Sequence, residues 1–110
     1  MRTATTAHGP DFDPEKAVAA ELLRGEHASV RVIRIAQGQS LPAHRHGESD
    51  LILYVAQGEA ILGEEGAGVP APAGTVAHLR GDETLRVRCA SAGGVTLLAF
   101  LAPPFPPQAG

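Results

Sequence analysis

Length, composition and charge already exclude several classes of protein. The chain has 110 residues, 44% of them apolar, which suffices for one packed core but not for two. Its net charge of −3 comes from twelve acidic and nine basic side chains. The basic residues are scattered along the chain, so no basic face is concentrated enough to bind nucleic acid. We therefore expect one globular domain with no nucleic-acid partner.

Neither a membrane segment nor an export signal is predicted. The longest apolar runs, residues 51–56 and 95–102, are far shorter than the roughly 20 residues that span a bilayer. The N-terminal stretch lacks the unbroken apolar core of a signal peptide. A single cysteine, Cys89, cannot form an internal disulfide, and its alternation with apolar residues predicts a buried core side chain. These features predict a cytoplasmic protein without a membrane partner.

The N-terminal quarter of the chain leaves two interpretations open. Residues 1–12 are polar and show no periodicity, which predicts a flexible N-terminal arm. Asp13 followed by Pro14 is typical of a helix start, with Gly25 as its stop. Residues 20–24 fit equally well as a strand paired with residues 30–35. We therefore expect one domain over residues 13–102 that begins with a short helix or an extra strand.

The rest of the chain is typical of an all-β fold. Short apolar or alternating segments are separated by glycine and proline turns, and they cover residues 30–36, 51–56, 60–62, 69–73, 85–89 and 95–101. Many short strands at close spacing indicate a sandwich or a barrel. Residues 103–110 form a proline-rich C-terminal tail, which cannot serve as a central strand because proline lacks the amide hydrogen.

A histidine pair, His44 and His46, is the first candidate for a functional site. On an extended strand, residues two apart project from the same face, so both imidazoles would stand side by side at a spacing that suits one metal ion. The plainer interpretation is a pair of exposed polar histidines near a turn, and the pair alone does not separate the two.

The surroundings of the pair resemble the cupin superfamily. Its first motif is a glycine, five residues, His-x-His, three or four residues, a glutamate, six residues and a glycine. The first motif is matched by Gly38, His44, His46 and Gly58. Its second motif is a glycine, five residues, Pro-x-Gly, two residues, a histidine, three residues and an asparagine. The second motif is matched by Gly66, Pro72, Gly74 and His78. The resemblance covers roughly residues 28–102 and has both motifs in order.

The sequence departs from these motifs at three places. Leu51 occupies the glutamate position, and Asp50 stands one residue earlier, where it would reach a metal only through a bulge or a shifted turn. Glu48 is a second candidate carboxylate, although it falls in a predicted turn. In the second motif, three residues instead of two separate Gly74 from His78, and Asp82 occupies the asparagine position.

The resemblance implies a cupin-type double-stranded β-helix, or jelly-roll barrel, with one divalent metal inside. The implied ligands are His44, His46 and His78, with Asp50 as a displaced fourth candidate, and zinc, iron, nickel or manganese would suit them. Such a site would act on a small organic molecule as an oxygenase, isomerase or lyase. Two alternatives stay open: a non-catalytic cupin that binds or senses a small molecule, and a metal-free isomerase that uses His78 with Asp82.

Alternation along the strands bears on the cavity and on assembly. Residues 51, 53 and 55 share one face of their strand and residues 50, 52 and 54 the other, but the sequence does not say which face is inside. Four arginines on predicted strands are expected to point outward: Arg31, Arg34, Arg86 and Arg88. The alternative is that one of them points inward and binds a substrate carboxylate. Strands that are apolar on both faces need a second surface to cover them, which predicts a homodimer. The resemblance to cupins, which are commonly dimers, implies the same.

Overall fold

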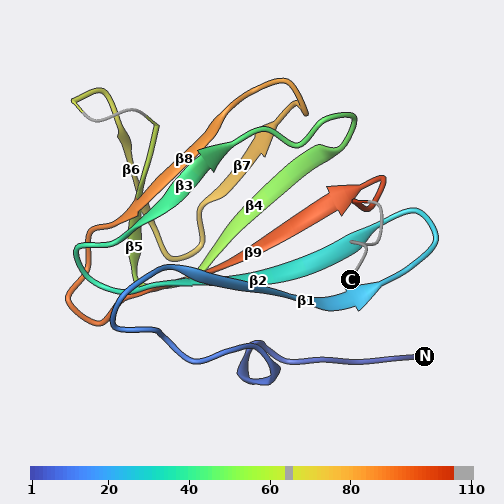
Figure 1. Ribbon diagram of the computed structural model, residues 1–110, viewed down its shortest axis with the longest axis horizontal. Helices are drawn as coiled ribbons and strands as arrows, with labels where there is room; N and C mark the ends of the chain where they lie inside the picture. Colours follow the sequence, from blue (N-terminus) through green and yellow to red (C-terminus); the bar gives the residue numbers. More distant parts are fainter. Residues whose placement is uncertain (64–65, 106–110) are drawn as a thin grey trace.

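The structure is a computed structural model that describes residues 1–63 and 66–105. In these residues the chain forms nine strands in two antiparallel sheets. The strands are β1 (Val18–Arg24), β2 (Ser29–Ile35), β3 (Ser40–His44), β4 (Asp50–Gln57), β5 (Glu59–Leu62), β6 (Val69–Pro72), β7 (Val76–Leu79), β8 (Leu85–Cys89) and β9 (Val95–Ala102). One sheet has the order β1-β2-β9-β4-β7 and the other β3-β8-β5-β6. Figure 1 shows the two sheets as the two layers of a jelly roll, which confirms the predicted all-β fold.

The first strand settles the ambiguity near the N-terminus. Residues 18–24 pair with β2 along most of their length, so the strand interpretation is confirmed and the helix interpretation is wrong. Asp13 does begin a local turn, because its side chain accepts a hydrogen bond from the Glu15 amide at 2.8 Å, but no helix follows. Pairing with β2 gives this short segment backbone partners along a whole strand, which a marginal helix cannot match.

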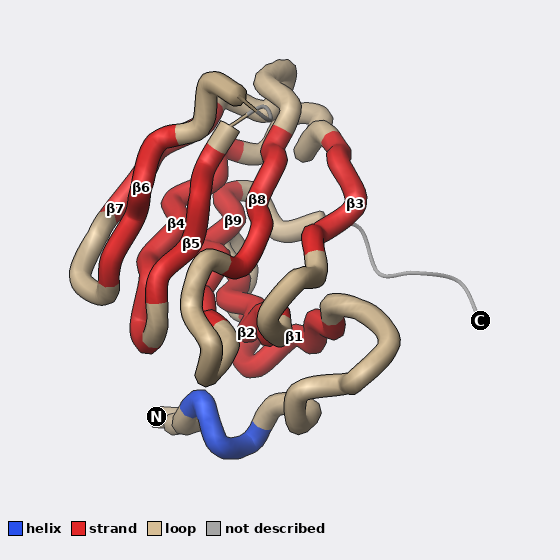
Figure 2. The backbone as a smooth tube through the Cα atoms, turned by 90° about the vertical axis from the view of Figure 1, so that its left-hand side faces the viewer, coloured by secondary structure: helices blue, strands red, loops and turns tan. Residues whose placement is uncertain are grey.

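The hydrophobic core lies between the two sheets, where Figure 2 shows them stacked. In β4 the side chains of Leu51, Leu53 and Val55 are buried in this core, while those of Asp50 and Ile52 are exposed. The inward face of β4 is therefore the apolar one that contains residues 51, 53 and 55. Cys89 is also buried in the core, as the alternation in its strand predicted.

The N-terminal arm lies along the outer face of the five-stranded sheet, below β1 and β2 in Figure 1. It contains one 3-10 turn, Thr6–His8, and it is held by Arg34, whose side chain is 9% exposed. The Arg34 guanidinium donates to the carbonyl oxygens of Pro10, at 2.7 Å, and Thr6, and to the hydroxyl of Thr96 at 3.0 Å. Arg34 thus points outward, as predicted, and fastens the arm to β2 and β9.

Two predicted segments fall partly beyond the described residues. The turn predicted before β6 includes residues 64–65, and the predicted proline-rich tail includes residues 106–110, which the structure does not describe. Within the described part of the chain, no helix is long and apolar enough to cross a membrane.

Candidate functional site

A tight turn after β3 positions the histidine pair. The backbone amide of His46 donates to the carbonyl of Gly81 at 2.9 Å, and the amide of Ser49 donates to the carbonyl of His46 at 3.0 Å. Gly47 inside the turn has φ +62°, a conformation that costs glycine little and other residues more. A Cβ on Gly81 would lie 1.9 Å from the Gly47 carbonyl oxygen, so only glycine allows this close approach. The two glycines therefore fix the backbone that carries His46.

The two imidazoles lie side by side, as the spacing predicted. Their ring centroids are 4.6 Å apart, with the ring planes at 57°. The Nδ1 atom of His44 lies 2.9 Å from the carbonyl oxygen of Pro42. Since a carbonyl oxygen only accepts, Nδ1 of His44 is the donor in this hydrogen bond.

His46 is the buried member of the pair. It is 4% exposed, and its Nδ1 atom is buried without a hydrogen-bond partner among the described residues. Its ring stacks on Phe105 with the centroids 5.7 Å apart and the planes at 8°. Burial, with a smaller contribution from the neighbouring His44, lowers the pKa of His46 below its ordinary value of 6.5. His46 is therefore a neutral imidazole near pH 7, with a polar atom that the protein leaves unsatisfied.

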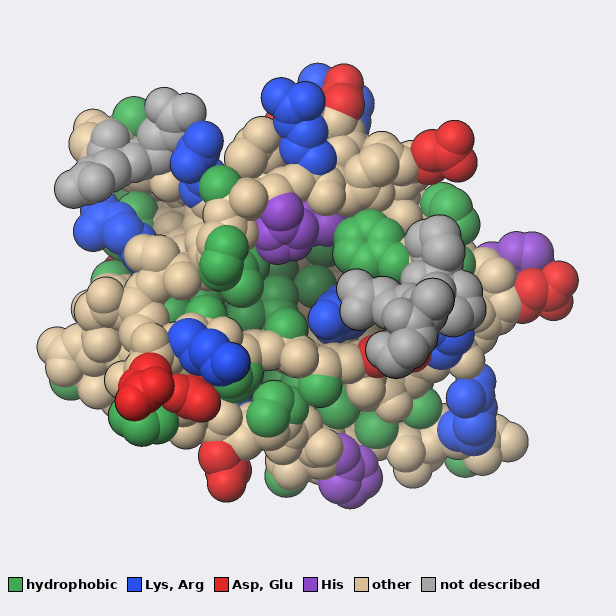
Figure 3. Space-filling model, viewed as in Figure 1, with side chains coloured by type: hydrophobic (Ala, Val, Ile, Leu, Met, Phe, Trp, Pro, Cys, Tyr) green, Lys and Arg blue, Asp and Glu red, His purple; other side chains and the backbone are tan. Residues whose placement is uncertain are grey.

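Both histidines line a cavity of about 190 Å³ between the two sheets, which we call the inner cavity. Its apolar lining residues are Ala19, Ile33, Leu41, Leu51, Leu85, Ala99, Leu101 and Phe105. Its polar lining residues are Arg31, His44 and His46. Figure 3 shows the hollow in the surface, with hydrophobic side chains at its base and histidine and basic side chains at its border. No acidic side chain is among these lining residues.

Arg31 is the inward arginine that the sequence left as an alternative. It lies on β2 opposite Ala99 of β9, and like Ala99 and Ile33 it lines the inner cavity. Arg34, on the same strand, lies on the opposite face and binds the N-terminal arm. The prediction that all four strand arginines point outward is therefore wrong for Arg31.

The structure does not bring His78 and Asp50 to the histidine pair. His78 lies opposite Ile52 in the sheet, and both are exposed on its outer face. There the Nε2 atom of His78 lies 3.2 Å from an oxygen of Asp50. The inward positions of β4 and β7 belong instead to Leu51 and to Ala77, which packs against the core. A shift of one residue along a strand reverses the side-chain direction, which explains both placements.

The three-histidine metal site therefore does not fit these residues. In residues 1–63 and 66–105, no group of three or more His, Cys, Asp or Glu side chains is arranged to hold a metal ion. Glu48 is exposed on the turn, and Asp82 lies 3.2 Å from the guanidinium of Arg80, so neither completes the pair. Two imidazoles alone fall short of the three protein ligands that catalytic zinc sites use.

Phe105 separates the inner cavity from a second hollow. A groove of about 430 Å³, which we call the tail groove, is lined by residues 45–49 and by Pro103, Pro104 and Phe105. His46 and Phe105 line both spaces, so their stacked rings form a shared wall. The Ser49 hydroxyl donates to the Pro103 carbonyl at 2.6 Å and fastens this end of the chain to the histidine turn. No sequence pattern predicts this role, because Phe105 belongs to a segment without strand periodicity.

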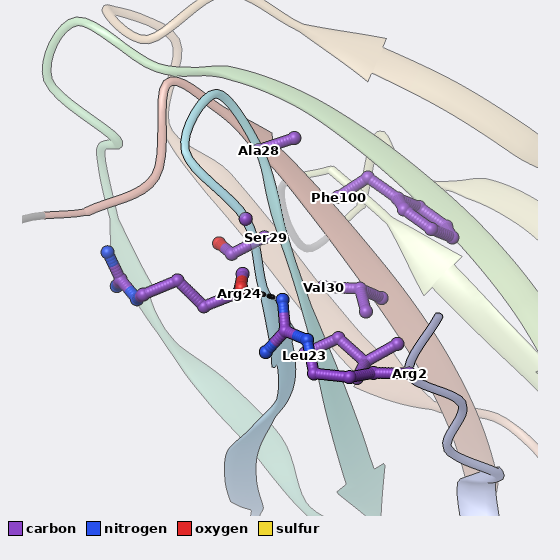
Figure 4. A pocket seen from close by; sticks show the side chains of 8 residues that line it. Arg2, Leu23, Arg24, Ala28, Ser29, Val30 and Phe100 are labelled. Carbon is purple, nitrogen blue, oxygen red and sulfur yellow. Dashed lines mark hydrogen bonds between the residues drawn. The ribbon is translucent and has the colours of Figure 1, made fainter.

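A third hollow, of about 270 Å³, lies near the β1–β2 hairpin and is drawn in Figure 4. Its charged groups already have partners, because Arg2 donates to the carbonyl of Arg24, and Arg24 contacts Glu21 at 2.9 Å. Leu23, Val30 and Phe100 form its apolar wall on the outer face of the sheet. The inner cavity is the better candidate, since it holds the histidine pair and an inward arginine.

Comparison with known proteins agrees with the fold. No protein-family model matches the chain, and a search of curated proteins finds no significant match. Solved structures do match it. An RmlC-like cupin protein from Desulfovibrio desulfuricans has a TM-score of 0.83 and 27% identity, over 96% of this chain and 99% of that one. An uncharacterised conserved protein with a double-stranded β-helix domain from Klebsiella pneumoniae has a TM-score of 0.84 and 17% identity, over 94% and 90%.

A third similar structure carries the name of an enzyme. A predicted oxalate decarboxylase from Thermotoga maritima has a TM-score of 0.76 and 18% identity, over 94% of this chain and 100% of that one. Sheet order, core and these similarities together define an all-β jelly roll. The chain has the double-stranded β-helix fold of small cupin domains and is similar in structure to an RmlC-like cupin protein.

Proposed function

We propose that this protein is a small-molecule-binding cupin whose ligand occupies the inner cavity, and that it works without the three-histidine metal centre. The observation that carries the proposal is that the histidine pair shares the inner cavity with Leu51 and other apolar side chains, while Asp50 and His78 lie on the outer face of the sheet. Apolar cavities with few polar groups are typical of small-molecule sites.

The size of the cavity limits the ligand. A dry apolar cavity of about 150 Å³ is large enough for benzene. The inner cavity has about 190 Å³, so it suits a molecule of one ring, or a short chain, with one small polar substituent. The buried Nδ1 of His46 has no hydrogen-bond partner in the described protein, so the histidine end of the cavity contains an unsatisfied polar group.

A cavity-filling variant tests the proposal. Ala99 lies on the inward face of β9 and lines the cavity, whereas Ala102 on the same strand is exposed. We expect small aromatic fragments to shift the NMR methyl signals of Leu51 and Leu85 in the wild type. Ala99→Leu should abolish these shifts because it fills the cavity, and Ala102→Leu should preserve them. Fragment binding that survives Ala99→Leu in a folded protein would place the ligand elsewhere and contradict the proposal.

A second candidate function is metal-dependent catalysis on a small molecule, which the orientation of His44 favours. Its Nδ1 donates to Pro42, and metal-bound histidines commonly hold their second nitrogen in this way. A divalent metal would then be held by His44 and His46 with solvent completing its coordination. Elemental analysis of protein purified without a histidine tag separates the candidates. One retained metal ion per chain, lost in His46→Ala, would favour this function over metal-free binding.

A further inference from the structure

We propose that the ligand of the inner cavity carries a carboxylate, and that Arg31 is the residue that selects it. This inference rests on the proposed function, because it names the chemical class of the molecule that enters the cavity. It concerns a residue outside both histidine motifs, at a position where the cavity has no other permanent charge.

The guanidinium of Arg31 lacks a protein counter-charge. In the described chain, no hydrogen bond or ion pair involves the Arg31 side chain. The nearest acidic residue in register is Glu21, opposite Arg31 on β1. Glu21 is paired with Arg24 instead, whose Nε lies 3.0 and 3.2 Å from its two oxygens. A partly buried cation without a partner is unfavourable, and an anionic ligand would relieve this cost.

The rest of the lining favours an anion on an apolar body. Among the described residues that line the cavity none is acidic, and the polar ones besides Arg31 are the two histidines. The Nδ1 of His44 is engaged with the Pro42 carbonyl, whereas no hydrogen bond within the described chain engages the ring of His46, which lines the cavity. One guanidinium and one imidazole N–H are a small donor set, sufficient for a single planar oxyanion.

Shape and charge select a carboxylate among the oxyanions. The planar fork of a guanidinium matches the two oxygens of a carboxylate, which it binds through two parallel hydrogen bonds. A phosphate group carries more charge and more oxygens, and it is held in proteins by several cations or by runs of backbone amides. Among its described lining residues the inner cavity has one arginine, two histidines and otherwise apolar side chains. A monocarboxylic acid with a compact apolar body therefore fits it best.

Pairs of isosteric acids and amides test this inference in the full chain. Benzoate and benzamide have the same shape, as have hexanoate and hexanamide, and each pair differs in charge. We expect the acid to bind about tenfold more tightly than its amide, as measured by NMR titration of the Leu51 and Leu85 methyl signals. The preference should fall to about twofold or less in Arg31→Gln. It should be unchanged in Arg88→Gln, since Arg88 is exposed on β8.

The outcomes separate this inference from the proposed function. Amides that bind the wild type as tightly as acids would overturn the inference and leave the cavity-binding function standing. If no member of either pair shifts the cavity signals, the proposed function fails and the inference fails with it. Inorganic phosphate that displaces benzoate at equal concentration would overturn the choice of a carboxylate. Arg31→Lys keeps the positive charge but lacks the two parallel N–H donors of the guanidinium. A folded Arg31→Lys variant with the full wild-type preference for the acid over its amide would overturn the role of the guanidinium.

Discussion

His78 and Asp50 form a pair on the outer face of the five-stranded sheet, with Nε2 of the imidazole 3.2 Å from a carboxylate oxygen. Both side chains are more than half exposed, at 53% and 65%. An exposed pair of this kind contributes about 0–1 kcal/mol to stability. Leu51 and Ala77, the residues next to them in the chain, take the inward positions, so neither Asp50 nor His78 faces the core.

Metal-ligating side chains placed at the inward positions 51 and 77 should create a metal site. In Leu51→Glu combined with Ala77→His, the new carboxylate would enter the cavity beside His44 and His46, and the new imidazole would take an inward position of the neighbouring strand β7. We expect the double variant to retain about one zinc ion per chain after dialysis and to be thermally stabilised by it, because metal binding to the native state adds to folding free energy. Elemental analysis and thermal unfolding measure the two effects.

The control variant places a carboxylate on the outer face of the sheet instead. Ile52→Glu puts a carboxylate opposite the native His78, and we expect it to retain no more zinc than the wild type. His78→Ala should likewise leave the metal content of the wild type unchanged. A folded Leu51→Glu, Ala77→His protein without metal would contradict the inward orientation of these two positions.

The buried imidazole of His46 should make stability depend on pH. Burial lowers its pKa in the folded state below 6.5, so the unfolded chain binds more protons than the native chain as the pH falls. The free energy of unfolding should therefore decrease as the pH is lowered through about 6.5, by at most about 1.4 kcal/mol per pH unit from this group. Chemical denaturation at a series of pH values measures the slope.

Replacing the ring isolates the contribution of His46. His46→Phe keeps a flat ring against Phe105 and removes the titration, so its stability should fall less than that of the wild type between pH 7 and pH 5. The matched variant His27→Gln, at a fully solvated histidine, should keep the wild-type slope. Equal slopes for His46→Phe and the wild type would show that His46 does not titrate as its burial requires.

Removing the shared wall should open the inner cavity to the tail groove. Phe105→Ala deletes the ring that stacks on His46, and loss of an aromatic contact with some apolar burial costs about 1–2 kcal/mol. We expect His46 to become reactive toward diethylpyrocarbonate, which mass spectrometry detects, while the wild-type ring is protected. The exposed ring of His27 serves as the internal reference in the same digest. Unchanged protection of His46 in the variant would argue against Phe105 as its cover.

Arg34 should fasten the N-terminal arm. Arg34→Met keeps an apolar stem beside Val32 and removes the bonds to Thr6, Pro10 and Thr96. Hydrogen bonds of a charged donor contribute about 1.5–3 kcal/mol when both partners are buried or partly buried. We expect faster proteolysis within residues 1–12 and a loss of about 2 kcal/mol of stability. Arg88→Met, at an exposed arginine, should change neither. Equal proteolysis rates for Arg34→Met and the wild type would show that other contacts hold the arm.

The outer face beyond the arm should mediate homodimer formation. Ile52 and Phe100 lie opposite each other in the sheet and are 39% and 42% exposed, and Val76 on the neighbouring strand is 63% exposed. A contiguous exposed apolar patch of this kind is typical of a protein interface, and a second copy would bury it symmetrically. Light scattering should give twice the chain mass for the wild type and the single mass for Ile52→Lys.

A matched substitution tests whether the effect belongs to this face. Val69 on β6 is as exposed as Val76 but belongs to the other sheet, so Val69→Lys should keep the dimer. A monomeric wild type at micromolar concentration would refute the assembly.

Local patterns in the sequence were sufficient for the architecture and for the histidine pair. Alternation along the strands and glycine at the turns predict an all-β fold because they act over a few residues. The spacing of His44 and His46 predicts neighbouring rings for the same reason, and the rings do lie 4.6 Å apart. The strand at residues 18–24 was one of two equal alternatives, since a short segment becomes a strand only when a partner strand is available.

Only the tertiary structure decided which face of each strand is inside. Side-chain direction alternates with every residue, so Asp50 and His78 lie on the outer face of the sheet while Leu51 and Ala77, one position away, face the core. The same alternation turns Arg31 inward and Arg34 outward on one strand. Phe105 joins the cavity through packing between distant parts of the chain, which no local pattern encodes. The chain's sequence thus determines which elements form, while sheet register and packing determine which side chains share a cavity.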